Sequence, residues 1–251
     1  MSSTARLLDG VTVGLSAGDA TDAAHRGVTP VTLDYFVREL TFQLLAVGAN
    51  LAYGGDMRRD GFTETIAEAA FRYEKRDSDG GMKRRLHHFV PWPVPTAADE
   101  GSLLTTYVGV IARTALDETG RPRRREPSGE DATPRAWEEG LGAMRRLLAE
   151  QIGACVAVGG KIEDYKGIMP GIVQEVDLAS ERSLPVYVAG GFGGAARQIV
   201  EERMTPGTLP AWAERSHLDV EEVSRLAETV DPDEAVTLVL MGLVRHAESR
   251  D

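Results

Sequence analysis

The chain has 251 residues, of which 42% are hydrophobic and 27% are charged, a composition typical of a globular protein. Its 28 basic and 39 acidic residues give a formal net charge of −11. Because affinity for duplex nucleic acid and for anionic membranes depends on basic side chains, this charge excludes both as natural partners. The first ten residues lack the features of a signal peptide, and no apolar stretch approaches the length of a membrane span. We therefore expect a cytoplasmic protein.

Five short apolar runs predict β-strands, each with a glycine or a turn signal at or just beyond its end. They lie at residues 11–15, 49–53, 88–92, 154–158 and 185–189. Near-continuous apolar strands of this length are typical of a sheet that is covered on both faces.

Helical patterns fill the intervals between these strands. They lie at residues 33–47, 62–73, 134–152 and 195–204, and another helix opens at Pro170. This alternation predicts an α/β fold, a Rossmann-like and doubly wound, mainly parallel sheet with helices on both faces.

We expect a single domain over residues 1–251, with a core at about 11–204 and a C-terminal helical extension at 205–251. The extension carries two helical segments within 219–247, separated by Asp231-Pro232. Their apolar stripe would pack either on the body of the domain or on a second subunit.

The single cysteine and the five histidines indicate no metal or disulfide chemistry. Cys155 lies inside an apolar run, so we expect a buried thiol rather than a reactive one. No histidine stands in an HExxH pattern or beside a cysteine pair. We expect no metal and no cofactor.

Glycine-rich loops follow four of the predicted strands and form the candidate ligand site. They contain Ser16 and Asp19, then Gly54, Gly55 and Asp56, then Gly159, Gly160 and Lys161, and finally Gly190, Gly191, Phe192 and Gly193. Ligands of an open parallel sheet bind beyond the carboxyl ends of its strands. Glycines there let the backbone approach a ligand and leave amides directed at anionic oxygens. Tight turns are the alternative reading, but four such loops at one sheet edge favour a site.

Two familiar phosphate motifs are incomplete in this chain. Residues 191–196 match GxGxxA, but no strand ending in an acidic residue follows at the expected distance. Gly160-Lys161 is not a P-loop, because Cys155 and Ile162 replace the required glycine and hydroxyl residue.

The combination of residues in the segment 159–176 is the least expected by chance in the sequence. It joins Lys161 to a turn ending at Gly171 and to Glu175 on the opening turns of a helix. A carboxylate there can accept hydrogen bonds from ribose hydroxyls or act as an acid or base, unless it serves only the helix dipole. Arg145, on the preceding helix, suits phosphate recognition, although such arginines are often solvated.

Taken together, five motifs resemble a SLOG domain. They are VGLSxGD, LxYGGD, AMR, VGGK(x5)GxMPGIxQE and VYVAGGFGG, and they extend from about residue 11 to residue 204. The chain is most similar to the TIR- and sirtuin-associated SLOG domains of Thoeris-type antiphage systems, and more distantly to the N-terminal sensing region of TRPM channels. The resemblance implies a Rossmann-like sheet that binds ADP-ribose or its cyclic forms made from NAD. It also implies that Arg145, Lys161 and Glu175 contact the ligand.

These observations favour a sensor of a small nucleotide-derived signal, acting as a regulatory module in antiphage or stress signalling. We expect a homo-oligomer that works with a fused or separately encoded effector. The alternative is a nucleotide N-glycosidic-bond hydrolase or transferase using Glu175, similar to the cytokinin-activating phosphoribohydrolases. Their compact PGGxGTxxE loop is replaced here by a longer one, which favours sensing. A third possibility is an assembly platform that uses the last two helices.

Overall fold

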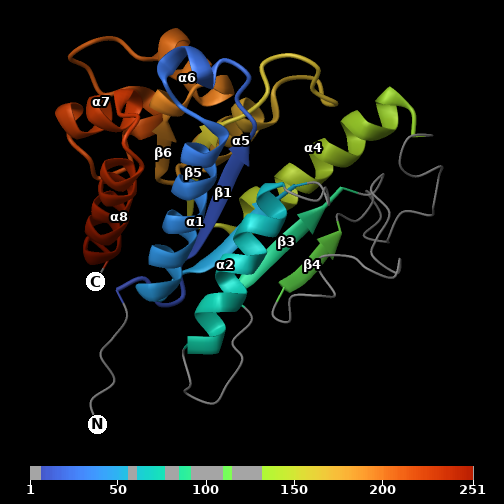
Figure 1. The fold of residues 1–251 in the computed structure, drawn as a ribbon, viewed down its shortest axis with the longest axis horizontal. Coiled ribbons are helices and arrows are strands. Elements are labelled where there is room, and N and C mark those ends of the chain that lie inside the picture. Colours follow the sequence, from blue (N-terminus) through green and yellow to red (C-terminus); the bar gives the residue numbers. More distant parts are fainter. Residues whose placement is uncertain (1–6, 56–60, 77–84, 92–109, 115–131, 251) are drawn as a thin grey trace.

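A computed structural model describes residues 7–55, 61–76, 85–91, 110–114 and 132–250 (Figure 1). These residues form a six-stranded sheet in the order β4-β3-β2-β1-β5-β6, and all five pairings between neighbours are parallel. The strands are β1 Thr12–Gly18, β2 Asn50–Gly54, β3 Leu86–Val90, β4 Val110–Thr114, β5 Ala154–Gly159 and β6 Val186–Ala189. The predicted Rossmann-like α/β fold is confirmed.

The helices alternate with the strands, as the sequence predicts. They are α1 Pro30–Ala46, α2 Phe62–Arg76, α4 Pro134–Gln151, α5 Gly171–Glu181, α6 Gly194–Arg203, α7 Val220–Glu228 and α8 Pro232–Glu248. Short 3₁₀ turns occupy η1 Ala23–Arg26, η3 Gly190–Phe192 and η4 Ala211–Ala213. Pro170 is the N-cap of α5 rather than a residue of its first turn.

One strand, β4, was not predicted from the sequence. Among the described strands it pairs with β3 alone, at the edge of the sheet, and the apolar part of its sequence VIART is limited to the first three residues. An edge strand needs less apolar sequence than a central one, because it is not enclosed by neighbours on both sides.

The strand order places a topological switch point between β1 and β5. From β1 the chain proceeds outward through β2, β3 and β4, and then returns to the other side of β1. β1 and β5 pair from Val13 and Ala154 to Gly18 and Gly159. Ligands of doubly wound sheets bind beyond the carboxyl ends of the strands at such a point.

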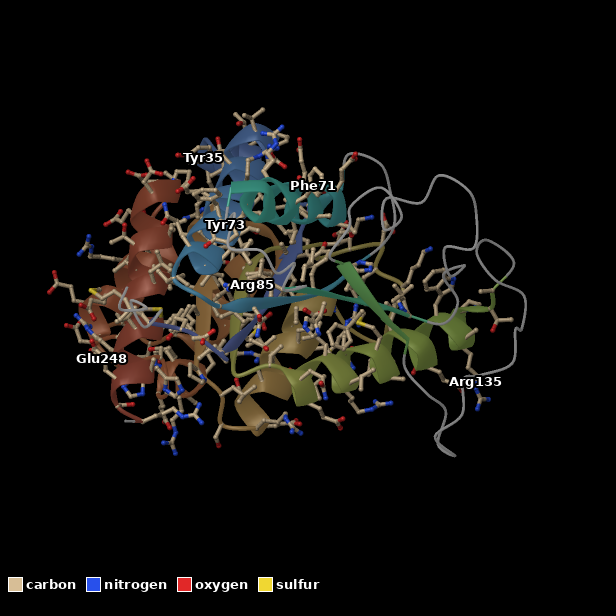
Figure 2. All side chains as sticks on the ribbon, turned by 90° about the horizontal axis from the view of Figure 1, so that it is seen from below. Tyr35, Phe71, Tyr73, Arg85, Arg135 and Glu248 are labelled. Atoms are coloured by element: carbon tan, nitrogen blue, oxygen red, sulfur yellow. The ribbon has the colours of Figure 1, made fainter. Side chains whose placement is uncertain are left out.

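Helices cover both faces of the sheet (Figure 2). Helices α1 and α2 pack together on one face, and α4 and α5 pack together on the other. Helix α1 begins with a capping box between Thr29 and Thr32 and has Pro30 in its first turn, which satisfies its first amides. Helix α4 starts in a similar way, with Thr133 as its N-cap and Pro134 in the first turn.

The C-terminal helices pack on the body of the domain. Helix α8 lies against α1, and α7 lies against β6. Val236 and Leu243, from the predicted apolar stripe, are buried within this single chain. Of the two sequence-based readings, packing on the body describes these residues.

Phe192 joins the two halves of the core. Its side chain is completely buried after β6, and its ring centroid lies 4.8 Å from that of Phe36 on α1. Among the residues that the structure describes, no helix is long and apolar enough to cross a membrane.

We predict that Phe192→Ala lowers the free energy of unfolding by about 3–5 kcal/mol, because it removes a buried aromatic ring and leaves a cavity. Urea denaturation monitored by circular dichroism measures this change. Ile168→Ala, at a side chain that is 58% exposed, is the control and should shift the free energy by less than about 0.5 kcal/mol. Equal effects of the two substitutions would contradict the role of Phe192 in the core.

Candidate functional site

A cavity of about 350 Å³ opens at the carboxyl ends of β1, β2 and β5. Helix α4 and the first turns of α5 complete its walls, together with the loop that joins β5 to α5. Since β1 and β5 flank the switch point, the cavity lies where the fold class places its ligands.

Nine of the predicted site residues line this cavity. They are Ser16, Asp19, Gly54, Gly55, Arg145, Gly160, Lys161, Gly171 and Glu175. Gly159 lies directly before them at the end of β5, and Asp56 lies outside the described residues. Segments separated by more than a hundred positions thus converge on one place.

The glycines at the end of β5 permit a close meeting of three backbone segments. Gly159 and Gly160 both have positive φ, 63° and 92°. The Gly160 amide donates to the Gly18 carbonyl oxygen at 2.8 Å, and the Ala195 amide donates to the Gly160 carbonyl oxygen at 2.9 Å. A Cβ atom on Gly159 would lie 2.2 Å from the Gly18 oxygen. These glycines are needed for packing, and the Gly160 amide is already engaged within the protein.

The loop after β6 does not join the cavity, although the sequence placed it in the same site. Gly190, Gly191, Phe192 and Gly193 are absent from the cavity walls. A Cβ atom on Gly191 would lie 1.9 Å from the Thr229 carbonyl oxygen, so this glycine is required by the end of α7. The Gly194 amide, at the start of α6, donates to the Asp22 carboxylate at 2.7 Å. The amide at the start of α6 is therefore already bound by a carboxylate of the protein itself.

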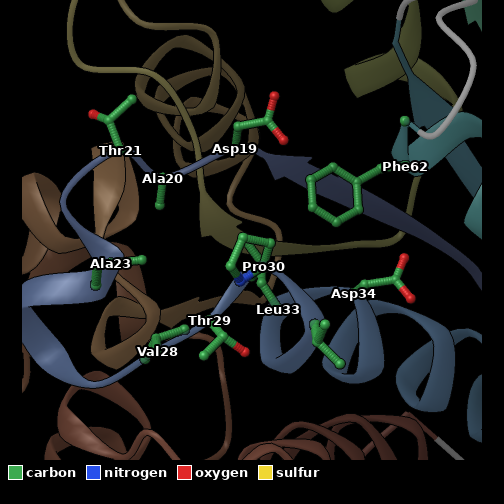
Figure 3. A pocket seen from close by; sticks show the side chains of 13 residues that line it. Asp19, Ala20, Thr21, Ala23, Val28, Thr29, Pro30, Leu33, Asp34 and Phe62 are labelled. Carbon is green, nitrogen blue, oxygen red and sulfur yellow. The ribbon is translucent and has the colours of Figure 1, made fainter.

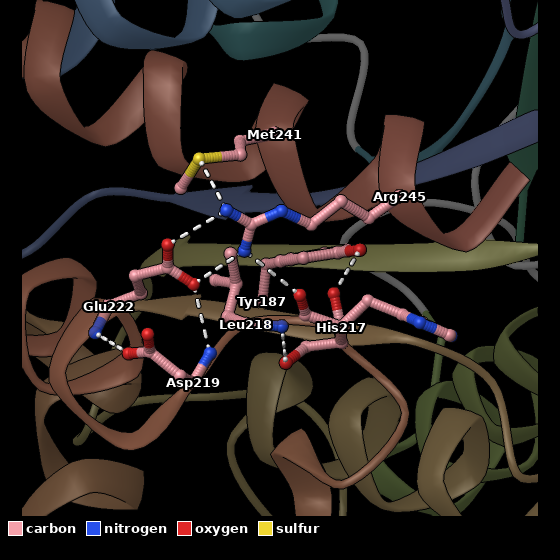
Figure 4. Close-up of polar contacts among 8 residues, drawn as sticks. Tyr187, His217, Leu218, Asp219, Glu222, Met241 and Arg245 are labelled. Carbon is pink, nitrogen blue, oxygen red and sulfur yellow. Dashed lines mark hydrogen bonds and ion pairs between the residues drawn. The ribbon is translucent and has the colours of Figure 1, made fainter. Parts of the chain in front are cut away.

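The segments behind β6 are held by a polar network (Figure 4). The Tyr187 hydroxyl on β6 donates to the Ser216 carbonyl oxygen at 3.0 Å. Arg245 on α8 donates to both carboxylate oxygens of Glu222 on α7, at 2.7 and 3.0 Å, and to the His217 carbonyl oxygen at 3.3 Å. These contacts join α7 to α8 and hold the segment before α7 against β6. They therefore support the loop that follows β6.

Arg145 organises the loop between β5 and α5. Its Nη1 donates to Gln174 Oε1 at 2.7 Å, and its Nε lies 3.4 Å from Glu175 Oε1. A Cβ atom on Gly171 would lie 2.5 Å from Arg145 Nη2. Gly171, Gln174 and Glu175 of the PGIVQE segment therefore all lie next to the guanidinium group of Arg145, which extends to them from α4.

Glu175 is a buried carboxyl group at the floor of the cavity. Burial raises its pKa above the ordinary value, while Arg145 and the Ser16 hydroxyl act in the lowering direction. Burial, with a smaller contribution from Glu175, also raises the pKa of Cys155, and the predicted burial of this thiol is confirmed.

Two buried polar atoms at this floor lack a well-aligned hydrogen bond. Arg145 Nε and Ser16 Oγ make no well-aligned hydrogen bond, although both lie close to Glu175. Both atoms are enclosed by the protein, so Arg145, Glu175 and Ser16 form one buried polar cluster beside the cavity.

The rim of the cavity contains residues that sequence reasoning missed. Trp137 on α4, together with Tyr165 and Lys166 on the β5–α5 loop, lines it, and Lys166 Nζ lies 3.9 Å from the centroid of the Trp137 ring. In the sequence, the aromatic residue Tyr165 in this loop was the signal that could have indicated an aromatic rim. Lys161 is exposed and makes no ion pair with any residue that the structure describes.

The cavity differs in charge from the rest of the chain. Its lining holds three basic residues, Arg145, Lys161 and Lys166, and three acidic ones, Asp19, Asp164 and Glu175. It is therefore balanced in a chain with a net charge of −11. Across the described residues, no group of three His, Cys, Asp or Glu side chains is arranged to hold a metal ion.

A second hollow of about 560 Å³ adjoins the first (Figure 3). It lies between the segment after β1 and the beginning of α1, and both hollows include Asp19 and Phe62 in their walls. Its Asp34 is already paired with Arg38, at 3.0 Å. Asp19 and Phe62 therefore border both hollows.

The chain is a Rossmann-like α/β domain with a cavity at its switch point. Residues 7–235 match the family model described as SLOG cluster2, and the chain belongs to this family of nucleotide-related SLOG domains. It is similar in fold to a crystal structure titled TM1055, a structural genomics target, with a TM-score of 0.50 and 19% sequence identity. That similarity covers 92% of this chain and 99% of the other. No curated protein matches the chain.

We predict that Glu175→Gln changes the pH dependence of stability in one direction. A carboxyl whose pKa is raised by folding binds more protons in the folded state, so its contribution is fully present at low pH and is lost as pH rises through the folded pKa. The wild type should therefore lose stability relative to Glu175→Gln as the pH rises from about 4.3, the ordinary pKa of a glutamate, toward neutral pH. Urea titrations of both proteins across this range measure the difference, and a constant difference would contradict the prediction.

Proposed function

We propose that this chain binds a nucleotide-derived anion, ADP-ribose or a cyclic isomer of it made from NAD, as a sensor domain. The observation that carries the proposal is the cavity at the switch point, whose lining combines the paired Arg145 and Glu175 with the exposed Lys161. Membership of the SLOG family supports a nucleotide-related ligand. The cavity volume is within the usual range of about 300–1,000 Å³ for small-molecule sites.

The rim provides the attraction for phosphate groups. Lys161 is exposed at the cavity and is not neutralised by a described carboxylate. Helix α5 begins at the cavity without a side-chain cap from any described residue, so its first amides and its dipole face the ligand space. Because the Gly160 amide is engaged by Gly18, these groups rather than the Gly159-Gly160 turn would hold the phosphates.

The floor suits the sugar of such a ligand. A carboxylate beside a guanidinium accepts hydrogen bonds from vicinal hydroxyls, and Glu175 lines the cavity next to Arg145. In a signalling setting, antiphage or stress-related, the bound state would be passed to a fused or separately encoded effector. A homo-oligomer is part of the same proposal.

We predict that Lys161→Glu weakens binding by about 10-fold or more, since it replaces a charge-assisted contact to phosphate by repulsion. Isothermal titration calorimetry with ADP-ribose, cyclic ADP-ribose, NAD and AMP measures the affinities. The matched control is Arg182→Glu, the same charge change at an exposed residue after α5 that does not line the cavity. Absence of binding to all four compounds by folded wild type rejects the proposal, as does equal binding by the two variants.

A second candidate function is hydrolysis or transfer at a nucleotide N-glycosidic bond. It is favoured by Glu175, whose raised pKa keeps a carboxyl proton nearer neutral pH, as general acid catalysis requires. Its position beside the cavity places it within reach of a bound sugar.

If the chain has this activity, incubation with AMP or NAD should release free base, and Glu175→Gln should lower the rate by about 100-fold or more. Chromatography of the products measures the release. Binding without any release of base assigns the site to sensing, and release that survives Glu175→Gln excludes this residue as the acid.

A further inference from the structure

The face of α4 that lines the cavity changes in chemistry along the helix. Trp137, Leu141, Met144 and Arg145 all line the cavity, at the spacing that places residues on one side of a helix. With a rise of about 1.5 Å per residue, Trp137 lies about 12 Å along the axis from Arg145. The buried end is cationic, the middle is apolar and the outer end is aromatic.

The outer end presents an aromatic ring that makes a cation–π contact. Trp137 is half-buried, and the Lys166 ammonium lies over its ring, 3.9 Å from the centroid. This cation–π contact shows that one ring face is directed toward the β5–α5 loop. Tyr165, 40% exposed on the same loop, adds a second ring to the rim.

We propose that Trp137 is the stacking platform for the nucleobase of the ligand, an inference that rests on the function proposed above. The sugar and phosphates then lie toward Arg145, Glu175 and Lys161, and Leu141 and Met144 line the space between the two ends. A ligand with a flat ring at one end and anionic groups toward the other matches this order of side chains. Lys166, beside the indole, adds a positive charge that a purely apolar ligand would not use.

Stacking of a base on an aromatic side chain changes affinity by roughly 5- to 100-fold. AMP and ribose 5-phosphate are the appropriate probes, because they share the sugar phosphate and differ only by the base. Wild type should bind AMP more tightly than ribose 5-phosphate. Trp137→Leu should weaken AMP by roughly 10-fold or more and leave ribose 5-phosphate within about twofold. Trp137→Phe, which keeps an aromatic face, should retain most of the preference for AMP.

Calorimetry with both probes measures these affinities, and circular dichroism checks that each variant is folded. Tyr35→Leu is the matched control, since it removes a partly exposed aromatic ring on α1 that does not line this cavity. It should leave both affinities unchanged. Quenching of tryptophan fluorescence by AMP, lost in Trp137→Phe, gives a second readout.

Failure of this inference differs from failure of the proposed function. Unchanged AMP affinity in Trp137→Leu overturns the inference while the site stands. So does an equal loss for AMP and ribose 5-phosphate, which would assign Trp137 to holding the loop. Equal affinity of wild type for the two probes also rejects the stacking role. If folded wild type binds neither these probes nor ADP-ribose, the proposed function and the inference fall together.

Discussion

The constraint on which the site depends is the close contact of three backbone segments at the switch point. The end of β1, the end of β5 and the start of α6 meet through the hydrogen bonds of Gly160 with Gly18 and Ala195. The approach is closer than any side chain allows, because a Cβ atom on Gly194 would lie 2.4 Å from the Gly160 oxygen. This junction sets where β1 delivers Ser16 and where β5 delivers Lys161. The position of the cavity is thus set by the packing of the backbone at this junction, and the side chains around it complete its walls.

Arg145 provides the second level of organisation. Its guanidinium lies in a buried position between α4 and the first turns of α5, and it contacts Gly171, Gln174 and Glu175. Burying a charge is unfavourable unless partners compensate it. For Arg145 the compensating partners are Glu175, through the ion pair, and Gln174, through the hydrogen bond. One arginine therefore holds the loop and sets the electrostatic environment of the carboxyl group. Removing Arg145 would therefore disturb the loop as well as the proposed contact with a ligand.

Much of the fold follows from the sequence, because central parallel strands and capped helices leave strong local signals. Five of the six strands in the described residues were predicted, and β4 was missed because an apolar run of three residues is too short to indicate a strand by itself. Strand β1 extends to Gly18, beyond its apolar residues, since its pairing with β5 continues to Gly159. The residues of β1 alone do not indicate that it will pair with β5 over this length.

The site was only partly predictable for the same reason. Arg145, Lys161 and Glu175 were expected at the ligand from the resemblance, and the structure does bring them to one cavity. The glycines after β6 look identical in sequence to those after β5, but Thr229 and Asp22 occupy their surroundings. Those two residues lie more than 30 and more than 160 positions away from that loop. Trp137 lacked a local signal because its partner, Lys166, is also distant along the chain.

The strand order also bears on how the molecule folds. Strands β1 and β2 are joined by one helix and form a local unit, whereas β1 must pair with β5 across a loop of about 140 residues. Closing a loop of that length carries an entropic penalty before any pairing compensates it, and contacts of this range slow folding. The cavity has one wall from each side of that loop, so it cannot exist until the most distant pairing in the sheet is made. Competence to bind would thus appear late on the folding pathway, after the N-terminal unit has already acquired its own structure.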